Sequence, residues 1–139
     1  MADVLVRWDR VTTEDDERWS WRRVLYGYLA PPHGEIVYIG KADYCSVYER
    51  WTESAKPKMW AKLDAAGIRK HGLIVGDIEL PRGRRLSVAL LGDVESLLIY
   101  SVQPSANTAC RRLRITRPGL TVECRGVWPY RQRLFSDDD

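Results

Sequence analysis

Two extended apolar runs separated by a turn constrain this chain more than any other feature. Residues 22–30 read RRVLYGYLA and residues 35–40 read EIVYIG, and PPHG lies between them. Valine, isoleucine and tyrosine favour extended backbone, whereas proline and glycine interrupt it. The segment therefore predicts a β-hairpin with a loop longer than the tightest two-residue turns.

Two short helices are expected after this hairpin. Ser46 is followed three residues later by Glu49, a capping-box pattern that opens a helix in SVYERWTESA. A second short helix is expected over residues 56–67, where Gly67 supplies the stop signal.

The middle of the chain predicts a strand and a longer helix. GLIVGDIEL at 72–80 predicts a strand. The apolar run RLSVALLG at 85–92 is a second possible strand, and its secondary structure is left open. DVESLLIYSVQP then predicts a helix with Asp93 as its N-cap and Pro104 at its end. The apolar face of this helix includes Val94, Leu97, Leu98 and Val102.

The two ends of the chain complete the expected fold. The polar TTEDDE segment at 12–17 fits either a short helix or a loop, and residues 112–128 alternate as in a final hairpin turning at Pro118 and Gly119. The element order predicts a small α+β domain with a central antiparallel β-sheet flanked by helices. With 139 residues, 45% of them hydrophobic, the chain fits one domain over 1–139.

Charge and cysteine content limit the setting. The net charge is only +3, but acids gather near residues 14–17 and 137–139, so the rest of the chain is more basic than this value suggests. Three well-separated cysteines argue against a disulfide framework and fit a reducing compartment. No apolar run reaches the roughly 20 residues of a membrane span, and the first residues lack the apolar core of a signal peptide. A cytoplasmic protein without a membrane partner is expected.

An ordered set of residues resembles the GIY-YIG nuclease superfamily. Tyr38, Ile39 and Gly40 spell YIG, and Lys41 follows directly. Further along come Arg50 on the first expected helix, Glu95 on the later helix and Asn107 shortly after it, at the family's arginine, glutamate and asparagine positions. The resemblance covers residues 24–108, the expected nuclease core, and leaves 109–139 as a basic C-terminal extension.

The first half of the signature is not literal. The chain has VLYGY, so either Tyr26 or Tyr28 is the first-strand tyrosine; they precede Tyr38 by 12 and 10 positions. Both lie on one strand face because side chains alternate with period two. Tyr26 is favoured since an apolar residue precedes it. The histidine that some family members carry one turn after the arginine is Ser54 here.

The resemblance implies a metal-dependent DNA endonuclease that hydrolyses phosphodiester bonds. Glu95 would hold one divalent cation, Mg²⁺ or Mn²⁺, and its expected place in the first helical turn would favour the carboxylate. Arg50 would bind phosphate oxygens. Tyr26, or else Tyr28, would be the general base or would position water, helped by Lys41 and the metal.

The other implied roles are supporting ones. Tyr38 would orient the first-strand tyrosine or contact the phosphate, and Asn107 would brace the site. A catalytically inactive nucleic-acid-binding or protein-interaction module on the same scaffold is the alternative function. Tyr44 and Tyr48 are interpreted as packing residues.

The C-terminal extension suggests how DNA is held. Arg111, Arg112, Arg114 and Arg117 alternate with apolar residues and would track a phosphate backbone. Trp128 and Tyr130 either stack on an unpaired base or cover the core. Either this extension reads DNA structure or sequence modestly by itself, or a second copy of the chain or a partner protein supplies further specificity.

Overall fold

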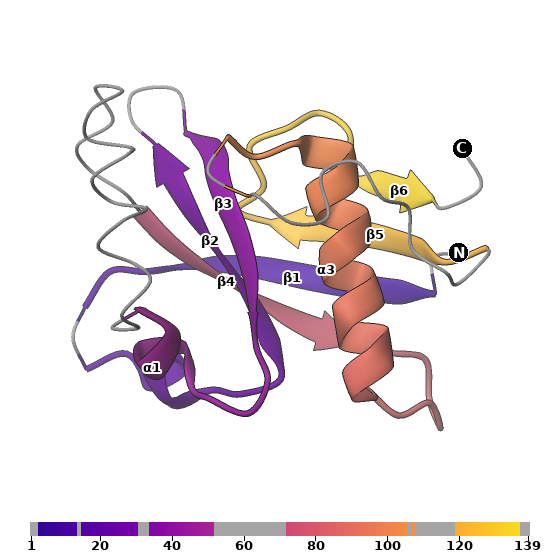
Figure 1. The fold of residues 1–139 in the computed structure, drawn as a ribbon, viewed down its shortest axis with the longest axis horizontal. Helices are drawn as coiled ribbons and strands as arrows, with labels where there is room; N and C mark the ends of the chain where they lie inside the picture. The colour runs from indigo at the N-terminus through magenta and orange to yellow at the C-terminus, as the bar shows by residue number, and fades with distance from the viewer. Residues whose placement is uncertain are drawn as a thin grey trace.

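The computed structural model describes residues 3–13, 15–30, 34–51, 72–105, 107 and 119–136. The elements, in chain order, are β1 (Val4–Val11), the 3₁₀ helix η1 (Glu17–Ser20), β2 (Val24–Ala30), β3 (Glu35–Ala42), α1 (Val47–Trp51), β4 (Gly72–Glu79), α3 (Val88–Val102), β5 (Thr121–Gly126) and β6 (Leu134–Ser136) (Figure 1). The predicted β2–β3 hairpin and the strand at β4 are confirmed.

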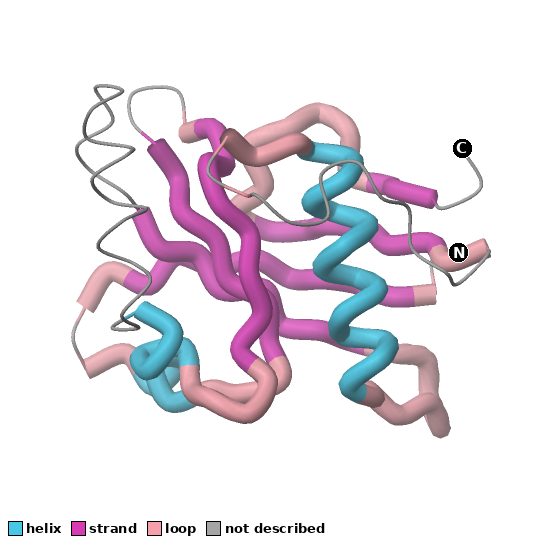
Figure 2. The backbone as a smooth tube through the Cα atoms, viewed as in Figure 1, coloured by secondary structure: helices cyan, strands magenta, loops and turns pink. Residues whose placement is uncertain are grey.

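The strands of the described residues form a six-stranded sheet in the order β3-β2-β4-β1-β5-β6. Its strands twist, so that β2 and β3 run almost crosswise to β5 and β6 (Figure 2). β1 pairs with β5 in parallel, whereas the other neighbours are antiparallel. The α+β class holds, but the expected antiparallel sheet is only partly correct, because β5 runs parallel to β1 and the sheet is therefore mixed.

The sheet separates two hydrophobic clusters. On one face α3 covers a cluster that includes Trp8, Leu25 and Ile39, and on the other Tyr26 and Tyr28 belong to a second cluster. β2 is buried along its whole length because it lies between β3 and β4 and has a cluster on each side. Burial on both faces explains why its sequence is an almost continuous apolar run.

α3 begins at Val88, not at Asp93 as predicted. Ser87 caps it, since its Oγ accepts a hydrogen bond from the Leu90 N–H at 3.0 Å. Leu90 and Leu91 are buried in the first turn of the helix. Each buried leucine stabilises the fold by about 1.5–3 kcal/mol, which outweighs the cost of roughly 1 kcal/mol for a glycine inside the helix at Gly92.

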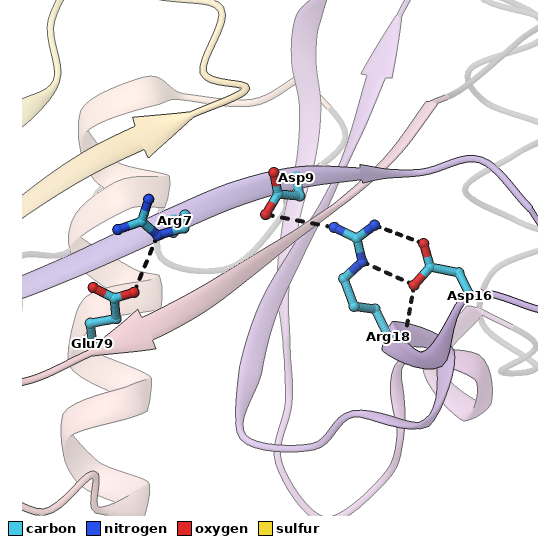
Figure 3. Close-up of polar contacts among 5 residues, drawn as sticks. All are labelled: Arg7, Asp9, Asp16, Arg18 and Glu79. Atoms are coloured by element: carbon cyan, nitrogen blue, oxygen red, sulfur yellow. Dashed lines mark hydrogen bonds and ion pairs between the residues drawn. The ribbon is translucent and has the colours of Figure 1, made fainter.

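η1 is fastened to β1 by charged side chains. Arg18 forms two hydrogen bonds to the Asp16 carboxylate, at 2.9 and 2.8 Å, and lies 3.6 Å from Asp9 on β1 (Figure 3). These hydrogen bonds hold the pKa of Asp16 below its usual value. Trp21 directly follows η1, and its C=O accepts a hydrogen bond from the Val47 N–H at 3.0 Å. This hydrogen bond attaches the first residue of α1 to the end of η1.

The C-terminal strands differ from the predicted hairpin at Pro118 and Gly119. β5 follows Gly119 but pairs with β1 and β6. Trp128 is buried against Trp8, at a ring distance of 5.7 Å, and so covers the core; base stacking by this residue is excluded. The preceding arm and the helix expected at 56–67 lie outside the described residues. Among the helices that are described, none is long and apolar enough to cross a membrane.

Candidate functional site

Three tyrosines lie together on the face of the hairpin opposite α3. Tyr28 pairs with Tyr38 in the sheet register, and their rings stack at 5.5 Å. The Tyr26 ring lies 5.7 Å from that of Tyr28 and 6.0 Å from that of Tyr38. The period-two expectation that Tyr26 and Tyr28 share a strand face is therefore confirmed.

Gly40 leaves the space that Tyr26 occupies. The two residues are paired across β2 and β3, and a Cβ atom at Gly40 would lie only 2.6 Å from both Cζ and Oη of Tyr26. Any larger residue at position 40 would displace this phenol. The YIG glycine thus has a steric reason, which the sequence alone did not reveal.

Tyr26, the favoured first-strand tyrosine, lies within the influence of the Arg50 charge. Burial raises the pKa of the Tyr26 phenol strongly, and the neighbouring Tyr38 and Tyr28 raise it further, while the Arg50 charge opposes them. The phenol is therefore held neutral at ordinary pH. Tyr28 is fully buried in the second cluster, and its ring packs against those of both Tyr26 and Tyr38.

Glu95 reaches the same hairpin from α3. Its carboxylate faces the Lys41 backbone N–H and lies within the fields of the Lys41 and Arg50 charges, all of which lower its pKa. Burial has the larger effect, however, and raises the pKa of Glu95 above its usual value. The expected help from the helix dipole is wrong, because α3 begins seven residues earlier and Glu95 lies in its interior.

Arg50 is positioned by the start of α1. The predicted capping box is confirmed: the Ser46 N–H donates to Glu49 at 3.1 Å, and the Glu49 N–H donates to Ser46 Oγ at 3.2 Å. The Arg50 N–H then donates to the Ser46 C=O at 3.1 Å. This cap fixes the direction of a helix of only five residues, and Arg50 on its last turn is half-buried beside the hairpin.

The Lys41 side chain extends toward α3. A Cβ atom at Gly92 would lie 3.3 Å from Lys41 Nζ. The ammonium group therefore lies against the helix one turn before Glu95. Lys41 contacts this region twice, through its backbone N–H at the Glu95 carboxylate and through its side chain at Gly92.

Asn107 braces the strand that carries YIG. Its Oδ1 accepts the Ile39 N–H at 2.9 Å and its Nδ2 donates to the Ile39 C=O at 2.8 Å, and the side chain is buried. β3 is the outer strand of the sheet, so the Asn107 amide takes the place of a missing neighbouring strand. Two buried hydrogen bonds of this kind contribute about 1–3 kcal/mol together.

The outer edge of β3 is the common element of the site. Besides Asn107 at Ile39 and Glu95 at Lys41, the Tyr130 hydroxyl accepts the Ile36 N–H at 2.9 Å. Side chains from α3 and from the segments after α3 and β5 thus meet the hairpin along one line. Sequence reasoning missed this because the two candidate roles of Tyr130 were base stacking and core cover.

The donor set fits one hard cation that keeps most of its water. Glu95 is the carboxylate of the predicted set, and within the described parts of the chain no three His, Cys, Asp or Glu side chains cluster as a metal site. The Asn107 amide is already bonded to Ile39. A single carboxylate suits Mg²⁺, which retains waters and takes further oxygens from a phosphate.

The remaining predicted residues divide into two groups. Tyr44 and Tyr48, interpreted as packing residues, are instead 76% and 57% exposed. The four arginines proposed to track DNA lie outside the described residues: Arg111, Arg112, Arg114 and Arg117.

An open depression of about 580 Å³ lies elsewhere, between Trp21, Arg23, Asp77 and Leu86. None of the predicted site residues lines it. No family model, no curated protein and no solved structure matches the chain.

Proposed function

We propose that the protein is a metal-dependent endonuclease that hydrolyses DNA phosphodiester bonds at the edge of β3, on a GIY-YIG-like scaffold. One observation carries the proposal: the Arg50 charge acts on both the Tyr26 phenol and the Glu95 carboxylate, which come from opposite faces of the sheet. Two of the residues that resemble the family's signature, Tyr26 and Glu95, are thus both within the influence of Arg50, although they are 69 residues apart in the sequence.

Arg50 and Lys41 bind the phosphate in this proposal. A guanidinium group offers a planar, permanently charged pair of donors that matches two phosphoryl oxygens. The Lys41 ammonium, beside Gly92, adds a second positive charge. Together they neutralise the charge that grows on the phosphoryl oxygens in the transition state.

Glu95 holds the metal ion. Lys41 and Arg50 already place positive charge beside this carboxylate, and this charge opposes the binding of a cation. The anionic phosphate offsets that charge and so favours cation binding. The affinities for the metal ion and for the substrate should therefore rise together. When bound, the cation supplies further positive charge to the phosphoryl oxygens. The raised pKa of Glu95 makes metal binding weaker at acidic pH, since a proton competes for the same oxygens.

Tyr26 acts as a hydrogen-bond donor that positions water or a phosphoryl oxygen. Burial raises the pKa of its phenol, so the protonated form prevails in the folded protein. A donor role needs this form, whereas a general-base role needs the phenolate. Of the two roles implied by the family, positioning therefore agrees better with the surroundings of Tyr26.

The first test is nicking of supercoiled plasmid with Mg²⁺ or Mn²⁺. Arg50→Lys and Arg50→Ala should lower the rate by roughly 10²–10³-fold, as for the loss of one transition-state donor. Glu95→Gln should abolish metal-dependent cleavage. Arg7→Ala and Glu79→Gln are matched controls, because this exposed pair lies on β1 and β4, away from the β2–β3 hairpin (Figure 3).

The outcomes separate the two candidate functions. Metal-dependent nicking that survives in both controls and is lost in the Arg50 and Glu95 variants supports the nuclease. DNA binding without nicking, unchanged by Glu95→Gln, would assign the chain to the binding module. Equal nicking by Glu95→Gln and the native protein would refute the site.

A further inference from the structure

We propose that the arginine loop, residues 80–87 between β4 and α3, binds the phosphate backbone of the DNA beside the cleaved bond, independently of base sequence. This inference rests on the proposed nuclease function and adds a surface that holds its substrate. The loop projects at the lower end of α3 in Figure 1.

The arginine loop carries concentrated positive charge. From Leu80 to Gly92 the chain has no acidic residue and three arginines: Arg82, Arg84 and Arg85. All three are exposed, and none of them forms an ion pair with another residue that the structure describes. Glu79, the acidic residue just before the loop, is paired with Arg7 on β1. The positive charge of the loop is therefore free to attract an anionic partner.

A backbone turn holds these arginines close together. The Arg84 N–H donates to the Pro81 C=O at 3.0 Å, which closes a four-residue turn. Gly83 in this turn has a φ of +86°, in the left-handed region that glycine adopts without strain. The Cα atoms of Arg82 and Arg85, three residues apart, are separated by at most about 11 Å. The three guanidinium groups therefore start from one short, fixed segment.

Arg23 joins the arginine loop to the hairpin of the proposed site. Its N–H donates to the Ala42 C=O, and its guanidinium Nη1 donates to the Leu86 C=O at 3.2 Å. Its φ is +58°, a left-handed conformation that is unusual for a residue with a long side chain. Arg23 is exposed and forms no ion pair within the described parts of the chain. A fourth guanidinium thus lies between the neighbour of Lys41 and the loop.

The arginine loop lies a few nucleotides from the proposed reacting phosphate. Lys41 Nζ lies beside Gly92, the fifth residue of α3. The helix rises by about 1.5 Å per residue, so Val88 at its start lies about 6 Å further along the axis. Arg85 precedes Val88 by three residues, which adds at most about 11 Å. A duplex strand covers the whole path of roughly 17 Å with about five nucleotides of 3.4 Å each.

A phosphate backbone is the partner that these features favour. Guanidinium groups match pairs of phosphoryl oxygens, and contacts to phosphates position a strand without reading its sequence. α3 has no acidic residue in its first turn, so the positive end of its dipole adds to the field of the loop. An acidic protein surface would also offer anions. DNA is favoured because the loop continues the positive charges of Lys41 and Arg50, which serve a phosphodiester in the proposed site.

The test measures how DNA binding depends on salt. Fluorescence anisotropy follows binding of two duplexes of unrelated sequence to the full chain carrying Glu95→Gln, which prevents turnover. In this parent, Arg82→Gln, Arg84→Gln and Arg85→Gln are introduced singly and together. Each phosphate contact that is lost should make the slope of log K against log salt concentration shallower by about 0.9, and weaken binding roughly eightfold at 0.1 M salt. Both duplexes should respond equally.

Two controls separate phosphate contacts from other effects. Lysine at the same three positions keeps the charges and should keep the slope of the parent. Arg10→Gln is the matched control for Arg84→Gln, because Arg10 is also exposed but lies beside Gly72 at the start of β4. The arginine loop follows the other end of this strand, roughly 23 Å away. Arg10→Gln should leave the slope unchanged. Because the replaced side chains are exposed, circular dichroism and thermal unfolding should show every variant to be folded.

The failures of the two proposals are distinguishable. If the native protein nicks plasmid but the triple glutamine variant keeps the slope of the parent, the arginine loop is refuted and the nuclease stands. Equal shallowing by Arg10→Gln and Arg84→Gln would also refute the loop, because it would indicate an effect of net charge alone. If DNA binds with the expected changes in slope but the native protein nicks no DNA, the nuclease is refuted and the loop stands. If the native protein binds no DNA, both proposals fail.

Discussion

Gly40→Ala is the sharpest single test of the site's geometry. The new Cβ atom would lie 2.6 Å from Cζ and Oη of Tyr26 and 2.9 Å from Cε1. Ordinary contact begins at 3.4 Å, so the ring must retreat by about 0.8 Å. It has little freedom to do so, since Tyr26 is buried and packs against the rings of Tyr28 and Tyr38.

Two opposing effects set the expected magnitude. Overpacking of a close-packed site costs about 1–3 kcal/mol, whereas replacing glycine by alanine at a compatible position stabilises by about 0.4–1 kcal/mol through the unfolded chain. Gly40→Ala should therefore destabilise the fold by roughly 0–2.6 kcal/mol. Gly72→Ala is the matched control on another strand, because its Cβ atom meets Arg10 at 3.5 Å and Leu29 at 3.7 Å, both ordinary contacts.

The free energy of unfolding is measured by urea titration with tryptophan fluorescence. Gly72→Ala should be neutral or stabilising, and the difference between the two variants isolates the contact with Tyr26. Tyr26→Leu removes the three clashing ring atoms, so Gly40→Ala should cost less in that background. Tyr26→Phe leaves Cζ in place and should give little relief. Equal stabilisation by Gly40→Ala and Gly72→Ala would refute the position assigned to the Tyr26 ring.

Three other substitutions or modifications probe single groups. Asn107→Asp keeps the acceptor for the Ile39 N–H but loses the donor to the Ile39 C=O. It should lower the free energy of unfolding by roughly 1–3 kcal/mol in urea titration at neutral pH. Stability should recover in acid, as the new carboxyl group gains a proton, and a loss that is independent of pH would contradict this. Glu95→Gln should raise the melting temperature at pH 7. Burial raises the pKa of Glu95 above 4.5 in the folded protein, so the folded protein binds more protons there than the unfolded chain does. The native protein therefore loses stability as pH rises from 4.5 through the folded pKa, and the glutamine variant avoids this loss. This gain should disappear below about pH 4, and an equal gain there would show another cause. Burial raises the pKa of the Cys124 thiol to about 12, so mass spectrometry should find Cys124 alkylated only after unfolding. The half-exposed Cys45 should react in the native protein. Labelling of Cys124 in the native protein would refute its burial.

Local patterns predicted the elements whose determinants are close in sequence. The β2–β3 hairpin and the capping box of Ser46 and Glu49 each depend on residues within a few positions of one another. β1 was missed although Val4, Val6 and Trp8 alternate on its buried face, because the polar segment after it favoured a short helix or a loop for this part of the chain.

Tertiary packing decided what local patterns could not. The sequence placed Gly92 just before the start of a helix. In the structure α3 begins before Gly92 and includes it, because Leu90 and Leu91 are buried on the helix. The parallel pairing of β1 with β5 joins segments more than 100 residues apart, and no local signal specifies it. For the same reason, the sequence indicated Glu95 and Lys41 as site residues but not that the Lys41 N–H would face the Glu95 carboxylate.

The outer edge of β3 also has a consequence for solubility. A terminal strand normally presents unpaired backbone groups that recruit strands from other molecules and start aggregation. Here Asn107 and Tyr130 bond to backbone groups of this strand and the Glu95 carboxylate faces its Lys41 N–H, so an incoming strand would have to displace them. Substitution of these side chains therefore opens a template for self-association as well as altering the site. The proposed chemistry and the colloidal stability of the protein therefore depend on the same strand.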